Sequence, residues 1–370
     1  MRGYGGVRVA FVRRHAVLQG VVHRNIARAG TRGRKRALAY INKGQRVIRT
    51  ACSLPPSTLY YIVSLMTTPS ATSGDGQEHS SLIEIDANSE TRAVTFTANG
   101  EYLVSGGTDG VRVWRVKDGE KTATMEAPYV RCVCVSKDGR WIAAGTFKDV
   151  VVWDATTYEP VFTHEETYMN AVDFSPDSTR LVTGSLNSTA SIWDIPARQR
   201  VLGPLRHRDV VIAARYSPNG TRIATATPNS VRVWDSGGGG SPIDIPVKIP
   251  PWYNTALLWS NHHLFVVSDS RIKQFDSSTG SEISDWPVPD SNDSSCIALP
   301  QHGEFIAYAT DYAVTVWDTS THAQLGRIQH PERIRSIALS PDNRFLAIGG
   351  EGGKITIKRL DRINASIMYY

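Results

Sequence analysis

The stretch "AVDFSPDSTRLVTGSLNSTASIWD" (171–194) decides the fold of this chain. Its apolar and polar residues alternate in "AVDF", in "RLVTGS" and in "ASIWD", and a period of two is typical of β-strands rather than helices. Ser-Pro-Asp and Leu-Asn-Ser separate the three runs, and both contain residue types that favour tight turns. The stretch therefore predicts three consecutive antiparallel strands, the last of which ends at Trp193 and Asp194.

The same pattern recurs along most of the chain, with neighbouring copies 39 to 42 residues apart. A tryptophan ends the third run in five copies, and two other residues take its place elsewhere. In chain order these residues are Trp114, Trp153, Trp193, Trp234, Phe275, Trp317 and Lys358. The segments between copies supply a fourth, more variable strand. Seven copies of such a unit predict a repeat architecture.

These residues resemble the WD40 family, and the resemblance covers residues 81–361. It implies an all-β fold, a seven-bladed propeller of four-stranded blades. The family joins a loop histidine, a Ser or Thr, a turn Asp and the Trp in a buried tetrad, which is incomplete here. Its histidines would be His164, His207 and His330. Its turn residues would be Asp109, Asn187, Asp269 and Asp311. We therefore expect the core to depend more on apolar packing than on tetrads.

The segment "SLIEID" (81–86) alternates like a strand but precedes the first copy. In the WD40 family an N-terminal segment supplies the outermost strand of the last blade, and "KITIK" (354–358) needs such a partner. We expect the two to pair, which would cover an exposed sheet edge. The alternative is that "SIMYY" (366–370) fills that edge.

Several features are compatible with catalysis or ligand binding, but each has a structural explanation. "SGGGGS" (236–241) lacks the strand-to-helix context of a phosphate loop and is interpreted as a surface turn. His262 and His263 have no further Cys or His at ligand spacing. No nucleophile elbow or HExxH pattern occurs. We therefore predict a protein that is not an enzyme and has no cofactor or metal.

Aligning the copies identifies the side chains that begin each first strand, on the face that carries the connections between blades. Arginines in copies seven, one and two predict a basic arc, which two tyrosines extend. Such an arc suits an acidic or phosphorylated peptide, since Arg offers forked hydrogen bonds and Tyr rigid contact area. The predicted partner-binding residues are Arg92, Tyr129, Arg131, Tyr168, Asn170, Tyr253, Arg333 and Arg335. Alternatively, they are ordinary solvated strand ends.

Charge is distributed unevenly along the 370 residues. Residues 1–65 contain 13 Lys and Arg and no acidic residue, which leaves 41 − 13 = 28 basic against 35 acidic residues in 66–370. This basic leader resembles a mitochondrial presequence, and "RGRKR" (32–36) could be a nuclear signal or a nucleic-acid patch. The other interpretation is that translation begins at Met66. We expect a leader that is disordered or partly helical (1–65), a flexible lead-in (66–80), the propeller (81–361) and a tail (362–370).

The sequence thus predicts a non-catalytic scaffold that presents propeller loops to other proteins within a larger complex. The four cysteines form no disulfide framework, and no apolar run is long enough to span a bilayer. The expected location is cytoplasmic or nuclear, or mitochondrial if residues 1–65 are a presequence. The alternative function is RNA association, in which the basic leader binds nucleic acid.

Overall fold

The computed structural model describes residues 36–39, 48–51, 83–166, 168–250, 257–261, 263–289, 296–300 and 302–360. The chain divides into two units, Met1–Gly76 and Gln77–Tyr370, and each is described by itself. In the first, β1 (Arg36–Ala39) pairs antiparallel with β2 (Ile48–Ala51). The rest of the predicted leader, the predicted lead-in and the predicted tail lie outside the described residues.

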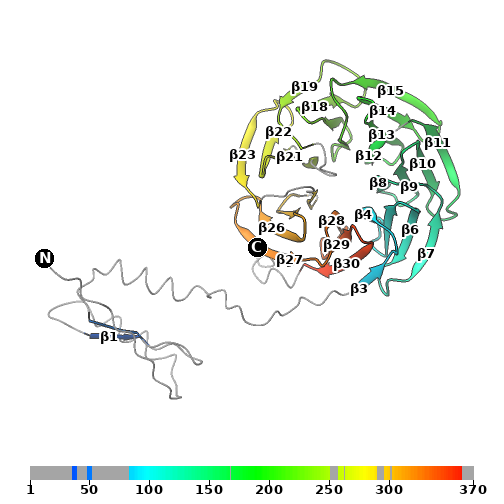
Figure 1. The fold of residues 1–370 in the computed structure, drawn as a ribbon. Coiled ribbons are helices and arrows are strands. Elements are labelled where there is room, and N and C mark those ends of the chain that lie inside the picture. The colour runs from blue at the N-terminus through cyan, green and yellow to red at the C-terminus, as the bar shows by residue number, and fades with distance from the viewer. Residues whose placement is uncertain are drawn as a thin grey trace. The chain divides into compact units, whose positions relative to one another are not determined.

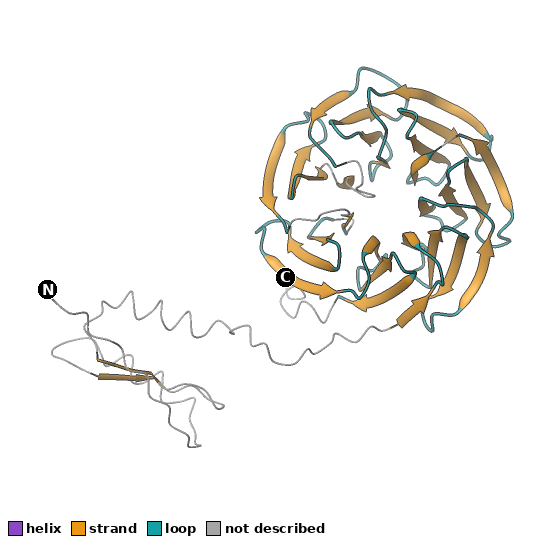
Figure 2. Ribbon diagram, viewed as in Figure 1, coloured by secondary structure: helices purple, strands orange, loops and turns teal. Residues whose placement is uncertain are grey.

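The second unit is a ring of seven four-stranded antiparallel sheets, as Figures 1 and 2 show. This confirms the predicted seven-bladed propeller. Each blade begins with a strand close to the ring axis and ends with one on the rim.

The first four blades each consist of consecutive strands. Blade one is β4 (Thr91–Phe96), β5 (Tyr102–Gly107), β6 (Gly110–Arg115) and β7 (Lys121–Met125). Blade two is β8 (Cys132–Val135), β9 (Trp141–Gly145), β10 (Asp149–Asp154) and β11 (Pro160–Glu165). Blade three is β12 (Met169–Phe174), β13 (Arg180–Ser185), β14 (Thr189–Asp194) and β15 (Gln199–Arg206). Blade four is β16 (Ala213–Tyr216), β17 (Arg222–Ala226), β18 (Ser230–Asp235) and β19 (Ile243–Pro246).

The remaining blades follow the same order, except that the last takes its outer strand from the start of the ring. Blade five is β20 (Leu257–Ser260), β21 (His263–Ser268), β22 (Arg271–Asp276) and β23 (Glu282–Pro287). Blade six is β24 (Cys296–Ala298), β25 (Phe305–Ala309), β26 (Ala313–Asp318) and β27 (Gln324–Gln329). Blade seven is β28 (Ile334–Leu339), β29 (Phe345–Gly350), β30 (Lys354–Arg359) and β3 (Ile83–Asp86).

The pairing of β3 with β30 closes the ring. Ile83 to Asp86 run antiparallel to Ile357 to Lys354, in unbroken register. Ile85 is 4% exposed and belongs to a cluster with Phe96 and Trp114 of blade one and Ile355 of blade seven. This confirms the N-terminal closing strand expected from "SLIEID", with its first residue at Ile83.

The hydrophobic core lies mainly between blades rather than within them. Three of the tryptophans that end third strands pack with apolar side chains of the preceding blade. Trp114 lies in a cluster with Ile355 of blade seven, Trp153 with Val104 of blade one, and Trp193 with Val152 of blade two. Burying such side chains contributes about 1.5–3 kcal/mol each, so the ring is held by contacts that no single blade makes alone.

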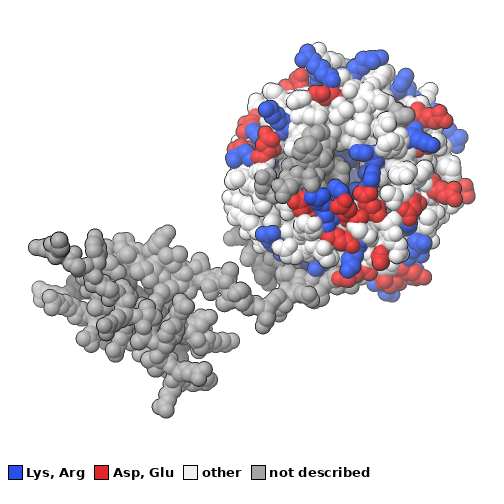
Figure 3. Space-filling model, in the orientation of Figure 1, with Lys and Arg blue, Asp and Glu red and all other residues white. Residues whose placement is uncertain are grey.

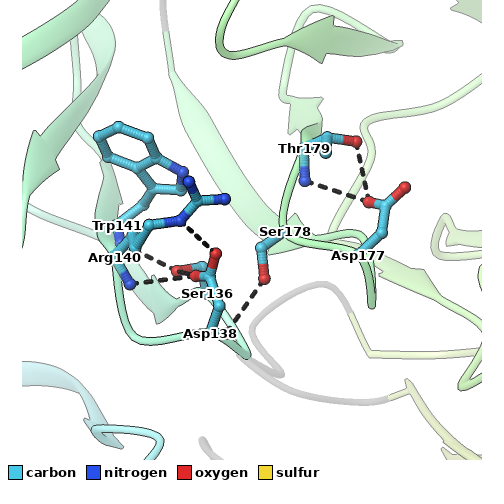
Figure 4. Close-up of polar contacts among 7 residues, drawn as sticks. All are labelled: Ser136, Asp138, Arg140, Trp141, Asp177, Ser178 and Thr179. Carbon is cyan, nitrogen blue, oxygen red and sulfur yellow. Dashed lines mark hydrogen bonds and ion pairs between the residues drawn. The ribbon is translucent and has the colours of Figure 1, made fainter.

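The turn between the first and second strands explains the recurrent Ser-Pro-Asp motif. In blade two, Ser136 Oγ donates to Asp138 Oδ1 (2.7 Å) and accepts from the backbone N–H of Trp141 (2.9 Å), as Figure 4 shows. Blades three, four and seven repeat this arrangement at Ser175, Ser217 and Ser340. The backbone N–H of Asp138 also donates to Ser178 Oγ of the next blade (3.1 Å). The motif therefore fixes the turn, and in blade two the turn also contacts its neighbour.

Candidate partner-binding face

The loops that lead into the innermost strands lie on the same face of the ring as the turns between second and third strands. Hydrogen bonds join the two sets: the N–H of Tyr129 donates to Thr108 O (3.1 Å), and that of Tyr168 to Phe147 O (2.9 Å). We call this side the entry face. Of the predicted binding residues, Tyr253 lies outside the described residues, and the other seven belong to strand starts and loops of this face.

Three of the four arginines of the predicted basic arc lie next to carboxylates of the same face. Arg92 donates from Nη2 to Glu90 Oε2 (2.8 Å). Arg335 of blade seven lies between the same Glu90 (3.8 Å) and Glu351 (2.8 Å). The three charged groups Arg92, Glu90 and Arg335 therefore connect blade seven to blade one across the closure of the ring.

Arg333, the residue before β28 of blade seven, forms an ion pair with Asp311 of blade six (3.6 Å). Figure 3 shows Lys and Arg side chains intermixed with Asp and Glu around the centre of the propeller, near β4 and β28. The surface predicted as a continuous basic arc is thus a row of alternating charges.

Arg131 and Asn170 connect three blades. Arg131 Nε donates to Asn170 Oδ1 (2.9 Å), and Asn170 Nδ2 lies 3.5 Å from Ile212 O at the start of blade four. Burial, together with the nearby charge of Arg92, lowers the pKa of Arg131 below its usual range, although a guanidinium stays protonated at neutral pH. The inner strands of neighbouring blades do not pair as a sheet, so such contacts join them where backbone hydrogen bonds do not.

Beside Arg131 and Asn170, three aromatic side chains form an exposed patch. Tyr129, Phe147 and Tyr168 are 56%, 40% and 40% exposed. The ring of Phe147 lies 4.3 Å from that of Tyr168, edge to face, and 6.4 Å from that of Tyr129. We call these three residues the aromatic patch. Contiguous exposed apolar surface of this kind is uncommon away from binding sites.

The backbone holds the patch in place. Tyr129 and Tyr168 have positive φ values of 56° and 60°, which a residue with a side chain adopts only at some cost in energy. The hydrogen bonds to Thr108 and Phe147 fix these two residues, and Tyr168 O also accepts from the N–H of Leu186 (3.0 Å). Both rings are therefore presented by a constrained backbone.

Comparison with known families agrees with this geometry. The family model described as "WD domain, G-beta repeat" matches residues 119–154, 157–194, 200–235 and 323–357. Each match begins near the outer strand of one blade and ends on the third strand of the next. The chain carries WD40 repeats.

Two curated proteins resemble part of this WD40 chain. Both are described as "U3 small nucleolar RNA-associated protein 15 homolog", one from Xenopus laevis and one from Gallus gallus, and they are 25% and 24% identical to it over 183 residues. In both cases the match covers 48% of this chain and 35% of the relative. The similarity thus spans about a third of the length of these relatives.

The WD40 tetrads are only partly formed. Trp114, Trp193 and Trp234 donate from Nε1 to Ser105 (2.8 Å), Thr183 (3.1 Å) and Thr225 (2.8 Å), as the family pattern implies. Two of the three expected histidines contact the indoles through their rings: His164 lies 4.1 Å from Trp193, and His207 lies 5.6 Å from Trp234, centroid to centroid. The third, His330, lies with Nδ1 2.9 Å from Glu332 O.

Two of the four turn residues expected for the tetrads have other partners. Asp109 accepts from Thr108 and Arg112, and Asp311 pairs with Arg333. No complete chain of four tetrad side chains is seen in the described part of the propeller.

The features that are compatible with catalysis or ligand binding can be located in the described residues. They contain no group of three or more His, Cys, Asp or Glu that could hold a metal ion, and His262 lies outside them. Burial raises the pKa of Cys132 to about 11 and that of Cys296 to about 12, so both thiols are protonated at neutral pH and are poor nucleophiles. "SGGGGS" (236–241) connects β18 to β19 as a loop, which confirms its interpretation as a turn. No helix among the described residues is long and apolar enough to cross a membrane.

Sequence analysis missed Phe147 and two of the carboxylates beside the arginines. Phe147 occupies the turn between the second and third strands, where most other copies carry Asp or Asn. A large aromatic residue at such a turn was the sequence feature that could have identified it. Asp311 had been assigned only to a tetrad, and Glu351 had no assigned role. Their pairing with Arg333 and Arg335 depends on which turns meet across neighbouring blades.

Proposed function

We propose that this protein is a non-catalytic scaffold that holds partner proteins on its entry face. The observation that carries the proposal is the aromatic patch: Tyr129, Phe147 and Tyr168 come from three separate segments, and all are exposed side by side. WD40 propellers in general bind other proteins, which supports the same function. The mechanism is rigid presentation of side chains, with no bond chemistry.

The aromatic rings would supply most of the binding energy. Large rings with few rotatable bonds lose little entropy on binding, and aromatic residues dominate the energetics of many protein interfaces. The constrained backbone of Tyr129 and Tyr168 lowers that cost further, because their loops are ordered before a partner arrives.

The neighbouring polar residues would set orientation and specificity. Arg131 and Asn170 lie beside the patch, and Arg92, Arg333 and Arg335 continue along the entry face toward blade seven. Tyr253, outside the described residues, is proposed as a further contact. Because Arg92, Arg333 and Arg335 already have internal carboxylates, an acidic partner segment would compete with these contacts and gain little net energy from them.

The proposal is tested by replacing the patch and measuring partner recovery. Tyr129→Ser, Phe147→Ser and Tyr168→Ser together should reduce recovery of native partners at least tenfold, because at least one or two kcal/mol of aromatic contact is lost. The measurement is quantitative mass spectrometry after affinity capture of the full chain from native cells. The matched control is Ile283→Ser, which removes an apolar side chain of similar exposure (50%) from β23. Equal recovery by wild type and triple variant would refute the proposal.

A second candidate function is RNA association. Two observations favour it: the leader holds 13 Lys and Arg without an acidic residue, and the names of both curated relatives refer to RNA. On this proposal the protein would be nuclear, and the leader would contact RNA phosphates while the propeller holds other proteins. Salt-sensitive RNA binding by the full chain should then disappear when residues 1–65 are removed.

A further inference from the structure

The outer edge of blade three carries the highest density of arginine on the propeller, in "ARQRVLGPLRHR" (197–208). This segment holds Arg198, Arg200, Arg206 and Arg208 and no acidic residue, although residues 66–370 as a whole carry more acid than base. All four arginines are exposed, on or beside β15. Figure 3 shows Lys and Arg side chains along this part of the rim. We call these four residues the β15 arginines.

Unlike Arg92, Arg333 and Arg335 of the entry face, the β15 arginines form no ion pair with any described residue. Arg92, Arg333 and Arg335 each lie within 4 Å of a carboxylate. Among the β15 arginines, Arg200 lies over the ring of Trp193 (5.8 Å from guanidinium carbon to centroid). Exposed guanidinium groups that form no ion pair within the chain attract anionic groups of a partner.

A small cavity lies at the end of this row. It has a volume of about 380 Å³, and Arg208, Arg232, Thr227 and Ser230 are among its lining residues. Its two carboxylates already have partners: Asp209 accepts from Asn229 (2.7 Å), and Asp244 lies 3.5 Å from Arg232. The ring nitrogens of His207, which also lines the cavity, are buried without a hydrogen-bond partner. The cavity is large enough for one acidic side chain, and two guanidinium and two hydroxyl groups line it besides the two carboxylates.

We propose that the β15 arginines and this cavity bind an extended acidic segment of a partner protein. This inference rests on the proposed scaffold function and names the chemistry of one partner and its site. Arg198 and Arg208 are ten residues apart, which at about 3.3 Å per residue gives a row of roughly 30 Å, long enough for an extended segment of about ten residues. Carboxylates along such a segment would form forked hydrogen bonds with the guanidinium groups.

Two features favour a protein segment over a nucleic acid. Single-stranded nucleic acid binds basic grooves that also offer exposed aromatic rings for base stacking, and the segment 197–208 contains no aromatic residue. It instead exposes the aliphatic Val201 (40%) between Arg200 and Arg206. Addition of a further β-strand is disfavoured, because Pro204 lacks an N–H and the register of β15 shifts twice against β14. The segment is therefore bound through side chains.

The test uses the full chain and synthetic peptides. A fluorescent twelve-residue peptide of alternating Asp, Glu and Val should bind at low salt at least tenfold more tightly than the same peptide with Asn and Gln. Reversal of Arg198, Arg206 and Arg208 to Glu should weaken acidic-peptide binding about tenfold or more, because three favourable charge contacts become repulsive. Arg200 is left in place because its guanidinium lies over Trp193. Affinity is measured by fluorescence anisotropy.

The matched control reverses three arginines that already have carboxylate partners, Arg115, Arg271 and Arg344. It changes the net charge equally and should lower the affinity less than threefold. An equal loss in both triple variants would overturn the proposal, as would unchanged affinity in the β15 variant. The proposal would also be overturned, in favour of RNA, if a twelve-nucleotide oligouridylate bound the wild type more tightly than the peptide does and the β15 variant lost that RNA binding.

The outcome is separable from that of the scaffold proposal. If the β15 variant still recovers native partners while the aromatic-patch variant does not, the scaffold function stands and this site fails. If neither variant loses a partner, both proposals fail.

Discussion

His207 occupies the tetrad position of its repeat but has no tetrad carboxylate as a partner. It precedes blade four where a WD40 repeat carries its tetrad histidine, but the turn of that blade is Pro228-Asn229 and offers no carboxylate. Asn229 donates to Asp209 instead, and both ring nitrogens of His207 are buried without a hydrogen bond. Burial, with the added charge of Arg232, lowers the pKa of His207 to about 4.

This low pKa predicts acid sensitivity. Between pH 6.5 and 4 the unfolded chain binds a proton at this site and the folded chain does not, so the free energy of unfolding falls as pH falls. The upper limit is about 1.4 kcal/mol per pH unit, reduced by solvent screening near the rim. His207→Asn should therefore flatten the dependence of the urea midpoint on pH in this range. The exposed His302→Asn is the control, and an equal slope in wild type and His207→Asn would contradict the account.

At the scale of the element, β3 closes the ring, and its position was predicted from alternation and from an unpaired partner strand. The strand contributes more than backbone pairing, because Ile85 fills the space between blades seven and one. Phe147 was not predicted, because the neighbours of a turn residue come from other segments and are known only from the assembled ring. The carboxylates beside Arg333 and Arg335 were missed for the same reason: they belong to other turns of the ring.

Removing the buried side chain of β3 should weaken closure. Ile85→Ala should lower the free energy of unfolding by about 2–4 kcal/mol, the range expected for a buried large-to-small change in a packed core. The same change on another outer strand, Ile283→Ala on β23, removes a half-exposed side chain and should cost less than about 1 kcal/mol. Both are measured by urea denaturation of the full chain. If the two variants were equally stable, β3 would not be a structural part of the ring.

At the scale of the whole molecule, periodicity made the architecture predictable and left the binding chemistry open. The repeat spacing and the Ser-Pro-Asp turns specify blades one after another, and each blade can be recognised from its own residues. A binding surface depends instead on loops that meet from different blades. Tyr129 and Tyr168 were found by aligning strand starts, whereas the charges around Arg92 and Arg335 became clear only from distances between blades.

The propeller has two proposed binding surfaces that differ in their chemistry. The aromatic patch and its polar neighbours occupy the entry face, and the β15 arginines occupy the rim of blade three. A scaffold with two separate surfaces could hold two partners at once, and each surface can be altered without the other. The ring between them is continuous, because the inner strands are joined by side-chain contacts such as Arg131 to Asn170 and Tyr216 to Asp173.

The most direct test of the central claim is hydrogen–deuterium exchange on the full chain, free and in the complex purified from native cells. The account predicts slower exchange in the complex at residues 126–131, 146–149 and 168–170, the backbone that carries the aromatic patch. Peptides from the opposite turns, such as residues 136–141, should exchange equally in both states. Protection confined to those opposite turns, or no difference at the patch, would contradict the claim that partners bind the entry face.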